Sequence, residues 1–237
     1  ETLGQHCIFR GLDGDGAGTF YEASVPMKKV MDQYGDVLLA FKMNGEEISR
    51  DHGYPVRVIV PGHVGARNVK WLSKITVSNE ESDSHWQRKD YKSFSPAVKD
   101  SIDWESAPSI QEMPVQSLIC CPASGSVLSS EVDEIEVTGY AWSGGGRDVI
   151  RVDVRVGEDT WYEAELEKPL DVTSQRAWSW CLWRATIPIP TDADGDIQIS
   201  CRAVDESYNI QPEAAKNVWN VRGLNNNAMH SIILTKE

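Results

Sequence analysis

The chain has 237 residues, of which 41% are hydrophobic and 25% are charged, and its formal net charge is −13. This composition is typical of a globular protein with one large domain or two ordinary ones. The acidic balance argues against a general nucleic-acid binder, which would present a basic face, and no run approaches the ~20 apolar residues of a membrane-spanning helix. We therefore expect neither nucleic acid nor a membrane as a partner, and assign the negative charge to solubility or to docking of a basic protein.

Residues 1–92 combine short predicted strands, glycine-containing turns and one short helix. The helix is expected to begin near Pro26, where methionine and valine recur at partial helical spacing. The apolar run 37–41 predicts a buried strand, and Asn44-Gly45 predicts a turn after it. This region is expected to be a mixed α+β portion of a domain.

The remaining residues form a connector and a series of strands. Serine and proline interrupt any regular pattern in residues 93–115, which we expect to be the connector. Beyond it, strands of alternating polarity are predicted at 134–138, 149–156, 178–183, 197–201 and 231–234. Several short strands separated by glycine, proline and aspartate turns predict an all-β antiparallel sandwich over 116–237. Trp178 and Trp180 share one face of their predicted strand and are expected in its core, with exposure at a subunit interface as the alternative. Residues 192–196 are expected to be a hairpin turn.

The five cysteines predict neither a disulfide framework nor a zinc site. Their number is odd, no Cys-x-x-Cys spacing occurs, and Cys120 and Cys121 are adjacent, so buried free thiols are expected. An EF-hand loop starting at Asp13 fails because Ser24 occupies the position that requires glutamate. No residue of the chain is therefore predicted to ligate a metal.

Cations gather in one stretch of this otherwise acidic chain. They are Arg50, Arg57, Arg67, Lys70 and Lys74. Gly62 and Gly65 in the same stretch allow backbone N–H groups to approach a ligand. Glycine combined with arginine and lysine is suited to an anionic phosphate, although the spacing is not that of a nucleotide P-loop. The alternative, from the residues alone, is a strand with solvated charges.

Five segments spread along the chain form an ordered set of motifs. They are Asp-His-Gly-Tyr-Pro-Val-Arg (51–57), Pro-Gly-His-Val-Gly-Ala-Arg (61–67), Val-Lys-Trp-Leu (69–72), Gly-Tyr-Ala-Trp-Ser-Gly-Gly-Gly-Arg (139–147) and Ile-Gln-Pro (210–212). Together they resemble the eukaryotic molybdenum oxidoreductases, namely sulfite oxidase and assimilatory nitrate reductase, along essentially the whole chain. The resemblance implies that residues 1–92 are the C-terminal part of a molybdopterin-binding oxidoreductase domain. It implies that residues 116–237 are an immunoglobulin-like dimerisation domain, and hence a homodimer.

The resemblance also implies a molybdenum–molybdopterin cofactor. Six residues fall where the family holds the pyranopterin and its phosphate: Asp13, His52, Arg57, Asn68, Val69 and Lys70. Arg57 and Lys70 would neutralise a phosphate dianion. His52 would donate to a pterin or phosphate oxygen.

Two further positions separate the members of the family. Tyr91 falls where sulfite oxidases place a tyrosine beside the molybdenum, and its hydroxyl would hydrogen-bond substrate or a metal oxo group and assist proton movement. Arg222 matches an arginine of the anion pocket, where similar nitrate reductases carry methionine. Because a doubly charged oxyanion gains more from an additional arginine than nitrate does, both positions favour sulfite. Taken singly, Tyr91 could be an ordinary surface tyrosine, and Arg222 could form a structural ion pair.

The function implied by the resemblance is oxidation of sulfite to sulfate at a molybdenum-pterin centre, with electrons passed to cytochrome c or oxygen. The alternatives are a nitrate reductase of the same family and, for this chain standing alone, a non-catalytic dimerisation module. The family's molybdenum-binding cysteine, and the haem b domain of animal members, would lie upstream of Glu1, so we expect the isolated chain to be inactive. The ending Leu-Thr-Lys-Glu is not a peroxisomal signal, which favours an animal-type enzyme of the mitochondrial intermembrane space.

Overall fold

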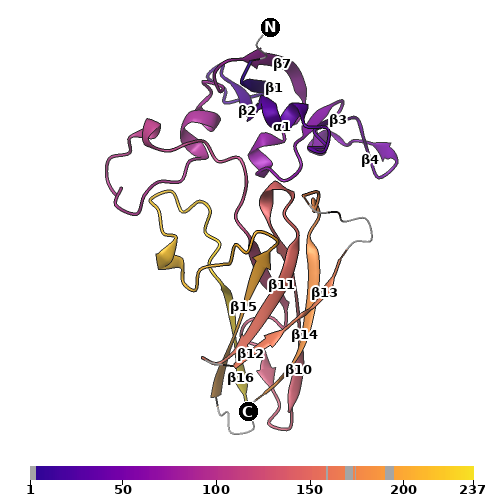
Figure 1. Ribbon diagram of the computed structural model, residues 1–237, viewed down its shortest axis with the longest axis vertical. Helices are drawn as coiled ribbons and strands as arrows, with labels where there is room; N and C mark the ends of the chain where they lie inside the picture. The colour runs from indigo at the N-terminus through magenta and orange to yellow at the C-terminus, as the bar shows by residue number, and fades with distance from the viewer. Residues whose placement is uncertain (1–3, 159, 169–172, 174, 190–194) are drawn as a thin grey trace. The chain divides into compact units, whose positions relative to one another are not determined.

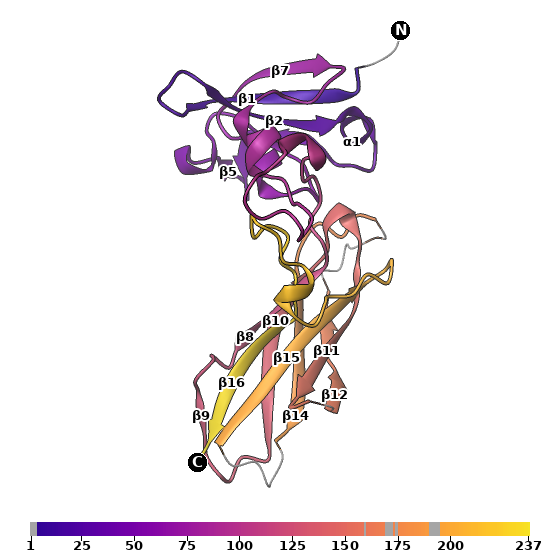
Figure 2. The ribbon, with the colours of Figure 1, turned by 90° about the vertical axis from the view of Figure 1, so that its left-hand side faces the viewer.

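The protein is β-rich and divides into two compact units. The computed structural model describes residues 4–158, 160–168, 173, 175–189 and 195–237. The first unit comprises Glu1–Met113 with Asn220–Leu224, and the second comprises Pro114–Trp219 with Asn225–Glu237. Figures 1 and 2 show strands throughout both units. Among the described residues, no helix is long and apolar enough to cross a membrane.

A three-stranded antiparallel sheet organises the first unit. In spatial order its strands are β2 (Phe20–Pro26), β1 (His6–Gly14) and β7 (Leu72–Ser78). Successive side chains of a strand point to opposite faces, so alternate residues of β1 such as Cys7 and Phe9 are buried. The resulting core consists of Cys7, Phe9, Ala23, Val25, Met27, Val58, Val60 and Val69.

The other elements of the first unit are short. The helix α1 (Met27–Met31) begins directly after Pro26, which confirms the predicted start. Two antiparallel ladders pair β3 (Leu38–Ala40) with β6 (Arg57–Ile59), and β4 (Lys42–Met43) with β5 (Glu46–Glu47). The helical turns are η1 (Arg50–His52), η2 (Gly65–Arg67), η3 (Trp86–Asp90) and η4 (Trp104–Ser106).

The turn between β4 and β5 confirms the prediction from Asn44-Gly45. Both residues have a positive φ, 54° and 86°, as a tight hairpin turn requires. The expectation that β3 is buried was wrong, because Leu38 and Leu39 are 48% and 49% exposed. β3 belongs to a two-stranded ladder, which offers too little neighbouring structure to cover both faces.

The second unit contains two sheets that share one core. One has the order β13-β14-β10-β8 and the other the order β12-β11-β15-β16-β9; among the described strands the β9–β16 pair is parallel and the other pairs are antiparallel. The strands are β8 (Gln116–Cys121), β9 (Val127–Leu128), β10 (Glu134–Trp142), β11 (Val149–Val156), β12 (Thr160–Glu163), β13 (Glu165–Glu167), β14 (Cys181–Pro188), β15 (Gly195–Asp205) and β16 (His230–Lys236). Two helical turns, η5 (Gly144–Gly146) and η6 (Ala215–Asn217), lie in its loops. The strands predicted at 134–138, 149–156, 197–201 and 231–234 are confirmed.

The centre of this core depends on one glycine. Trp183 of β14 is 1% exposed and lies opposite Gly139 of β10. A Cβ atom at Gly139 would lie 2.0 Å from the Leu118 carbonyl oxygen and 2.4 Å from a Trp183 ring atom. Only glycine therefore allows the indole to cross this strand.

Other sequence expectations for the second unit were partly wrong. Trp180 is 60% exposed and stacks on Tyr140 with 4.5 Å between ring centroids, because β14 begins only at Cys181 and leaves Trp180 outside the alternating strand. All five cysteines are free, but Cys120 and Cys121 are exposed at the end of β8 rather than buried. Of the turn predicted at 192–196, residues 192–194 lie outside the described residues.

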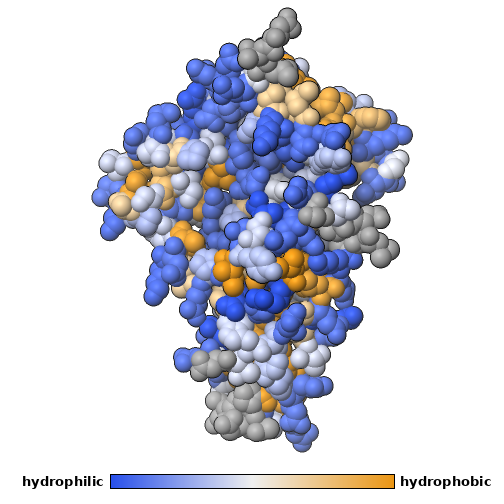
Figure 3. All heavy atoms as spheres, viewed as in Figure 1, coloured by the Kyte–Doolittle hydropathy of each residue, from blue (hydrophilic) through white to orange (hydrophobic). Residues whose placement is uncertain are grey.

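Figure 3 shows a face on which hydrophilic residues predominate, in keeping with the net charge of −13.

Candidate functional site

Strand β6 and the segment after η2 bring four of the predicted cofactor residues together. Arg57 donates from Nη1 to the His52 carbonyl oxygen at 3.0 Å and from Nη2 to the Asn68 carbonyl oxygen at 3.4 Å. The backbone N–H of Val58 donates to the Val69 carbonyl oxygen at 2.9 Å. His52, Arg57, Asn68 and Val69 thus surround one point of the first unit.

Lys70 joins the same group from the next position of the chain. Its Nζ donates to the Asp51 carbonyl oxygen at 2.8 Å and lies 4.4 Å from the centroid of the Trp71 ring. Gly53, with a φ of 113°, makes room for the two cations, because a Cβ atom there would lie 3.0 Å from the Lys70 Cβ and 3.1 Å from the Arg57 Cβ. The glycine therefore allows two positive side chains to lie against one backbone.

Asp13 lies at the edge of this group. A Cβ atom at Gly11 would be 2.1 Å from Asp13 Oδ1 and 2.9 Å from the Lys70 carbonyl oxygen, so the carboxylate and the Lys70 backbone face the same small space. Asp13 Oδ1 and Arg57 Nε are both buried without a hydrogen-bond partner among the described residues. Buried polar atoms normally have partners. One unsatisfied acceptor and one unsatisfied donor fit a ligand that offers both a hydrogen-bond donor and an acceptor. We call these six predicted residues the Arg57–Lys70 cluster.

A second group forms around Tyr91 and Arg222, which are 131 positions apart. Arg222 Nη2 lies 3.3 Å from both the carbonyl oxygen and Oδ1 of Asp90, the residue before Tyr91. The guanidinium also lies 5.7 Å from the centroid of the Trp104 ring. Its side chain is 34% exposed, so it is held in place yet remains open to a solvent-borne anion. We call Asp90, Tyr91, Trp104 and Arg222 the Tyr91–Arg222 cluster.

Residues of both clusters affect the pKa of Tyr21. Its hydroxyl donates to the Ala66 carbonyl oxygen at 2.7 Å. Burial, and next the neighbouring Tyr91, raise the pKa of Tyr21 to about 12; Asp13 and Asp90 act in the same direction, whereas Arg67 opposes them. Tyr21 is therefore within electrostatic range of Asp13 from one cluster and of Tyr91 from the other. Among the described residues, no hydrogen bond, ion pair or ring contact joins the two clusters directly.

The sequence interpretation missed Tyr21, Asp90 and Trp104. The sequence could have indicated Asp90, because a carboxylate directly before the proposed Tyr91 is a suitable partner for the proposed Arg222. Tyr21 and Trp104 are isolated aromatic residues, and their position depends on tertiary packing that no local pattern encodes.

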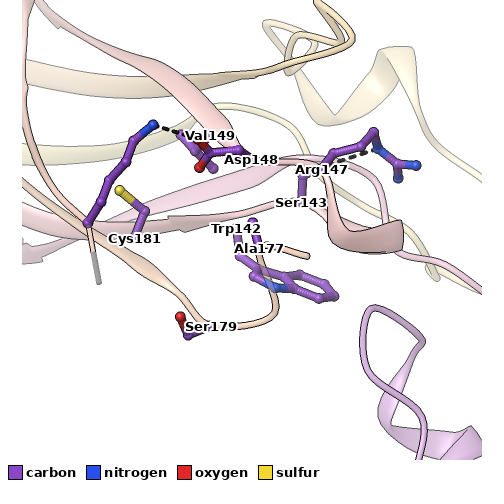
Figure 4. Close-up of a pocket in the computed structure, with 9 residues that line it drawn as sticks. Trp142, Ser143, Arg147, Asp148, Val149, Ala177, Ser179 and Cys181 are labelled. Carbon is purple, nitrogen blue, oxygen red and sulfur yellow. Dashed lines mark hydrogen bonds and ion pairs between the residues drawn. The ribbon is translucent and has the colours of Figure 1, made fainter. Parts of the chain in front are cut away.

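Figure 4 shows a different cavity, in the second unit. Its lining includes Trp142, Asp148, Lys168 and Cys181, and its volume is about 10 Å³. Lys168 Nζ pairs with Asp148 Oδ2 at 2.7 Å beside it. Such a volume is enough for about one water molecule, so the cavity is too small for a substrate. In the part of the chain that the structure describes, histidine, cysteine, aspartate and glutamate form no group able to hold a metal ion.

Comparison with known proteins relates both regions to one class of enzyme. Residues 2–86 match the oxidoreductase molybdopterin binding domain, and residues 107–237 match the Mo-co oxidoreductase dimerisation domain. The chain is 51% identical over 229 residues to the mitochondrial sulfite oxidase of Mus musculus, covering 96% of this chain and 41% of that protein. It is 38% identical over 237 residues to nitrate reductase [NADH] 1 of Phaseolus vulgaris, covering 94% of this chain and 26% of that protein.

A solved structure is also similar to this chain. The sulfane dehydrogenase SoxCD of Paracoccus pantotrophus superimposes with a TM-score of 0.74 at 28% identity, covering 98% of this chain and 55% of that chain. The chain thus spans only about two-fifths of the length of the mammalian relative that it matches, 41%.

Proposed function

The chain belongs to the molybdenum-cofactor oxidoreductases, the family of the sulfite oxidases, and on that premise we propose that the complete protein oxidises sulfite to sulfate. The observation that carries the proposal is the contact of Arg222 with Asp90, the residue before Tyr91, although Arg222 and Asp90 are 132 positions apart in the sequence. An arginine there provides a fork of donors for an oxyanion. Sulfite carries more charge than nitrate and gains more from it.

The Arg57–Lys70 cluster would hold the pyranopterin and its phosphate. Arg57 and Lys70 are the cations for a phosphate dianion, and His52 and the backbone of Asn68 and Val69 are the neighbouring hydrogen-bonding groups. The unsatisfied Asp13 Oδ1 and Arg57 Nε support this assignment, because a bound pterin would offer them a donor and an acceptor. When bound, the molybdenum cofactor supplies the redox chemistry, while the protein provides binding, orientation and electrostatics.

The Tyr91–Arg222 cluster would bind the substrate. Arg222 would orient the sulfite oxygens and balance their charge. The Tyr91 hydroxyl would hydrogen-bond the anion and move a proton during turnover. Trp104, whose ring lies under the Arg222 guanidinium, limits the directions in which that side chain can point, and orientation of this kind is a large part of catalysis.

The domain organisation follows from the same proposal. Residues 1–92 would be the C-terminal part of the molybdopterin domain, 93–115 a connector, and 116–237 an immunoglobulin-like domain that forms a homodimer. The two sheets around one core in the second unit and the match to a dimerisation domain support this reading. By analogy with the mitochondrial relatives, the protein would act in the mitochondrial intermembrane space. It would pass electrons to cytochrome c through an upstream haem b, or directly to oxygen.

Steady-state assays of the complete protein test the proposed function. Molybdenum and pterin are first quantified, since a non-catalytic dimerisation module would contain neither. The loaded protein is then assayed with sulfite and with nitrate. We expect sulfite-dependent reduction of an electron acceptor and no nitrate reduction, and the reverse pattern would identify a nitrate reductase.

A further inference from the structure

Arg67 is a fully buried cation that the proposed function does not use. It ends the turn η2, and its side chain is 0% exposed. Nε and Nη2 donate to the Ile110 carbonyl oxygen at 2.9 and 2.7 Å, and Nη1 donates to Oε1 of Gln87. A guanidinium removed from water in this way is costly unless its donors are satisfied. The three hydrogen bonds satisfy its nitrogens and fix the orientation of the guanidinium.

The carboxylate of Glu81 is linked to Arg67 only through the neutral side chain of Gln87. Among the described residues, no carboxylate lies within ion-pair distance of Arg67. Its acceptor Gln87 is neutral, and Gln87 Nε2 donates to Glu81 Oε2 at 2.8 Å, where Ser109 Oγ donates at the same distance. Arg67, Gln87 and the partly buried Glu81 thus form a chain of hydrogen-bonded side chains in which the carboxylate compensates the cation through the neutral Gln87. Because burial weakens screening, positive potential extends from Arg67 to its other neighbours.

Tyr91 is also a neighbour of the Arg67 guanidinium. The Arg67 Cζ lies 5.9 Å from the centroid of the Tyr91 ring, within the range of a cation–π contact, which is strongest where water is excluded. Arg67 also opposes the rise in the pKa of Tyr21, which is partly buried and is affected by residues of both clusters. One fixed cation therefore acts on both phenols near the proposed substrate site.

We propose that Arg67 is a positioning residue for Tyr91: held by Gln87 and Ile110, its guanidinium fixes the Tyr91 ring and sets the positive potential at the phenol. The inference rests on the proposed function, in which Tyr91 serves sulfite oxidation. A side chain that must meet a substrate anion benefits from support by groups whose own orientation is locked. Arg67 is locked by three hydrogen bonds from different nitrogens.

A double-mutant cycle in the complete, cofactor-loaded protein tests the coupling. Arg67→Met is made in the wild-type background and in Tyr91→Phe, and kcat and KM for sulfite are measured for all four proteins. If Arg67 acts through Tyr91, kcat falls about tenfold or more in the first background and less than about twofold in the second. Equal losses in both backgrounds would mean that Arg67 serves structure alone and would overturn the proposal.

A second readout separates this inference from the proposed function. The complete protein is prepared with 3-fluorotyrosine at position 91, and its ¹⁹F resonance is compared with and without Arg67→Met. We expect the resonance to shift, and no shift with the control Arg184→Met, whose ion pairs with Glu165 and Glu167 lie in the second unit. If Tyr91→Phe leaves turnover unchanged, the assigned role of Tyr91 fails, and the ¹⁹F result alone decides whether Arg67 positions that ring.

A charge exchange covers the case in which Arg67→Met does not fold. Gln87→Glu combined with Glu81→Gln keeps the net charge and the size of both side chains, but moves the carboxylate next to Arg67. The positive potential at Tyr91 should fall, with a shifted ¹⁹F resonance and a lower kcat. Wild-type values for both quantities in this variant would refute the proposal.

Discussion

Replacing Arg222 by methionine should weaken sulfite binding about tenfold or more. In the free protein its Nη2 lies 3.3 Å from two Asp90 oxygens, with 34% of the side chain exposed. A partly solvated pair of this kind contributes only ~0–1 kcal/mol. A charge-assisted hydrogen bond to a bound anion is worth ~1.5–3 kcal/mol. Subtracting the Asp90 contact leaves ~0.5–3 kcal/mol, and the middle of this range, ~1.8 kcal/mol, exceeds the ~1.4 kcal/mol of a tenfold rise.

The assay is a steady-state titration of the complete protein with sulfite. Arg222→Met should raise KM with a smaller effect on kcat, since in the proposed function the arginine would bind the anion before and during reaction. Arg222→Lys is the matched control, because it keeps the charge but loses the planar fork. Its KM should lie between those of the wild type and Arg222→Met. An unchanged KM in Arg222→Met would remove this residue from the substrate site and refute the reasoning.

Three further variants test the cofactor cluster, the buried histidine and the core of the second unit. Lys70→Met should reduce the molybdenum and pterin content of the purified complete protein, while the exposed neighbour change Lys74→Met should not; equal contents would contradict the assignment. Burial lowers the pKa of His63 from 6.5 to about 4. The unfolded state therefore binds a proton first as the pH falls below 6.5, and the free energy of unfolding decreases by ~1.4 kcal/mol per pH unit towards pH 4. Urea unfolding at pH 7 and 5 should show about 2 kcal/mol of this loss, absent in His63→Asn but retained in His85→Asn. Gly139→Ala should lower the Tm of the second unit by about 10 °C, from an overpacking cost of ~1–3 kcal/mol, and an unchanged melting curve would exclude the predicted clash.

The strands of the second unit were predictable because each has one buried face. The alternation over 149–156 coincides with β11 (Val149–Val156), whose valines at alternate positions enter the core. The pattern failed where burial does not alternate with sequence. An apolar run at Leu38 predicts burial, but β3 has only one partner strand. Trp180 lies just before β14, so the periodicity of that strand does not apply to it.

The candidate site was predictable only in part. Local composition indicated an anion-binding segment around Arg57 and Lys70, and the structure brings those residues together with His52 and Asn68. The pairing of Arg222 with the segment of Tyr91 was expected from family resemblance alone, since no periodicity relates positions so far apart; the structure shows the contact of Arg222 with Asp90. The burial of Arg67 could not be anticipated, because its partners Gln87 and Ile110 come from segments that are distant in the chain.

The most direct test of the account is a crystal structure of the complete protein with its cofactor and sulfate bound. We expect the pterin phosphate on Arg57 and Lys70, and the sulfate within hydrogen-bond distance of both Arg222 and the Tyr91 hydroxyl. A sulfate or pterin held elsewhere, with Tyr91 and Arg222 facing solvent, would contradict the claim that these residues form one substrate site.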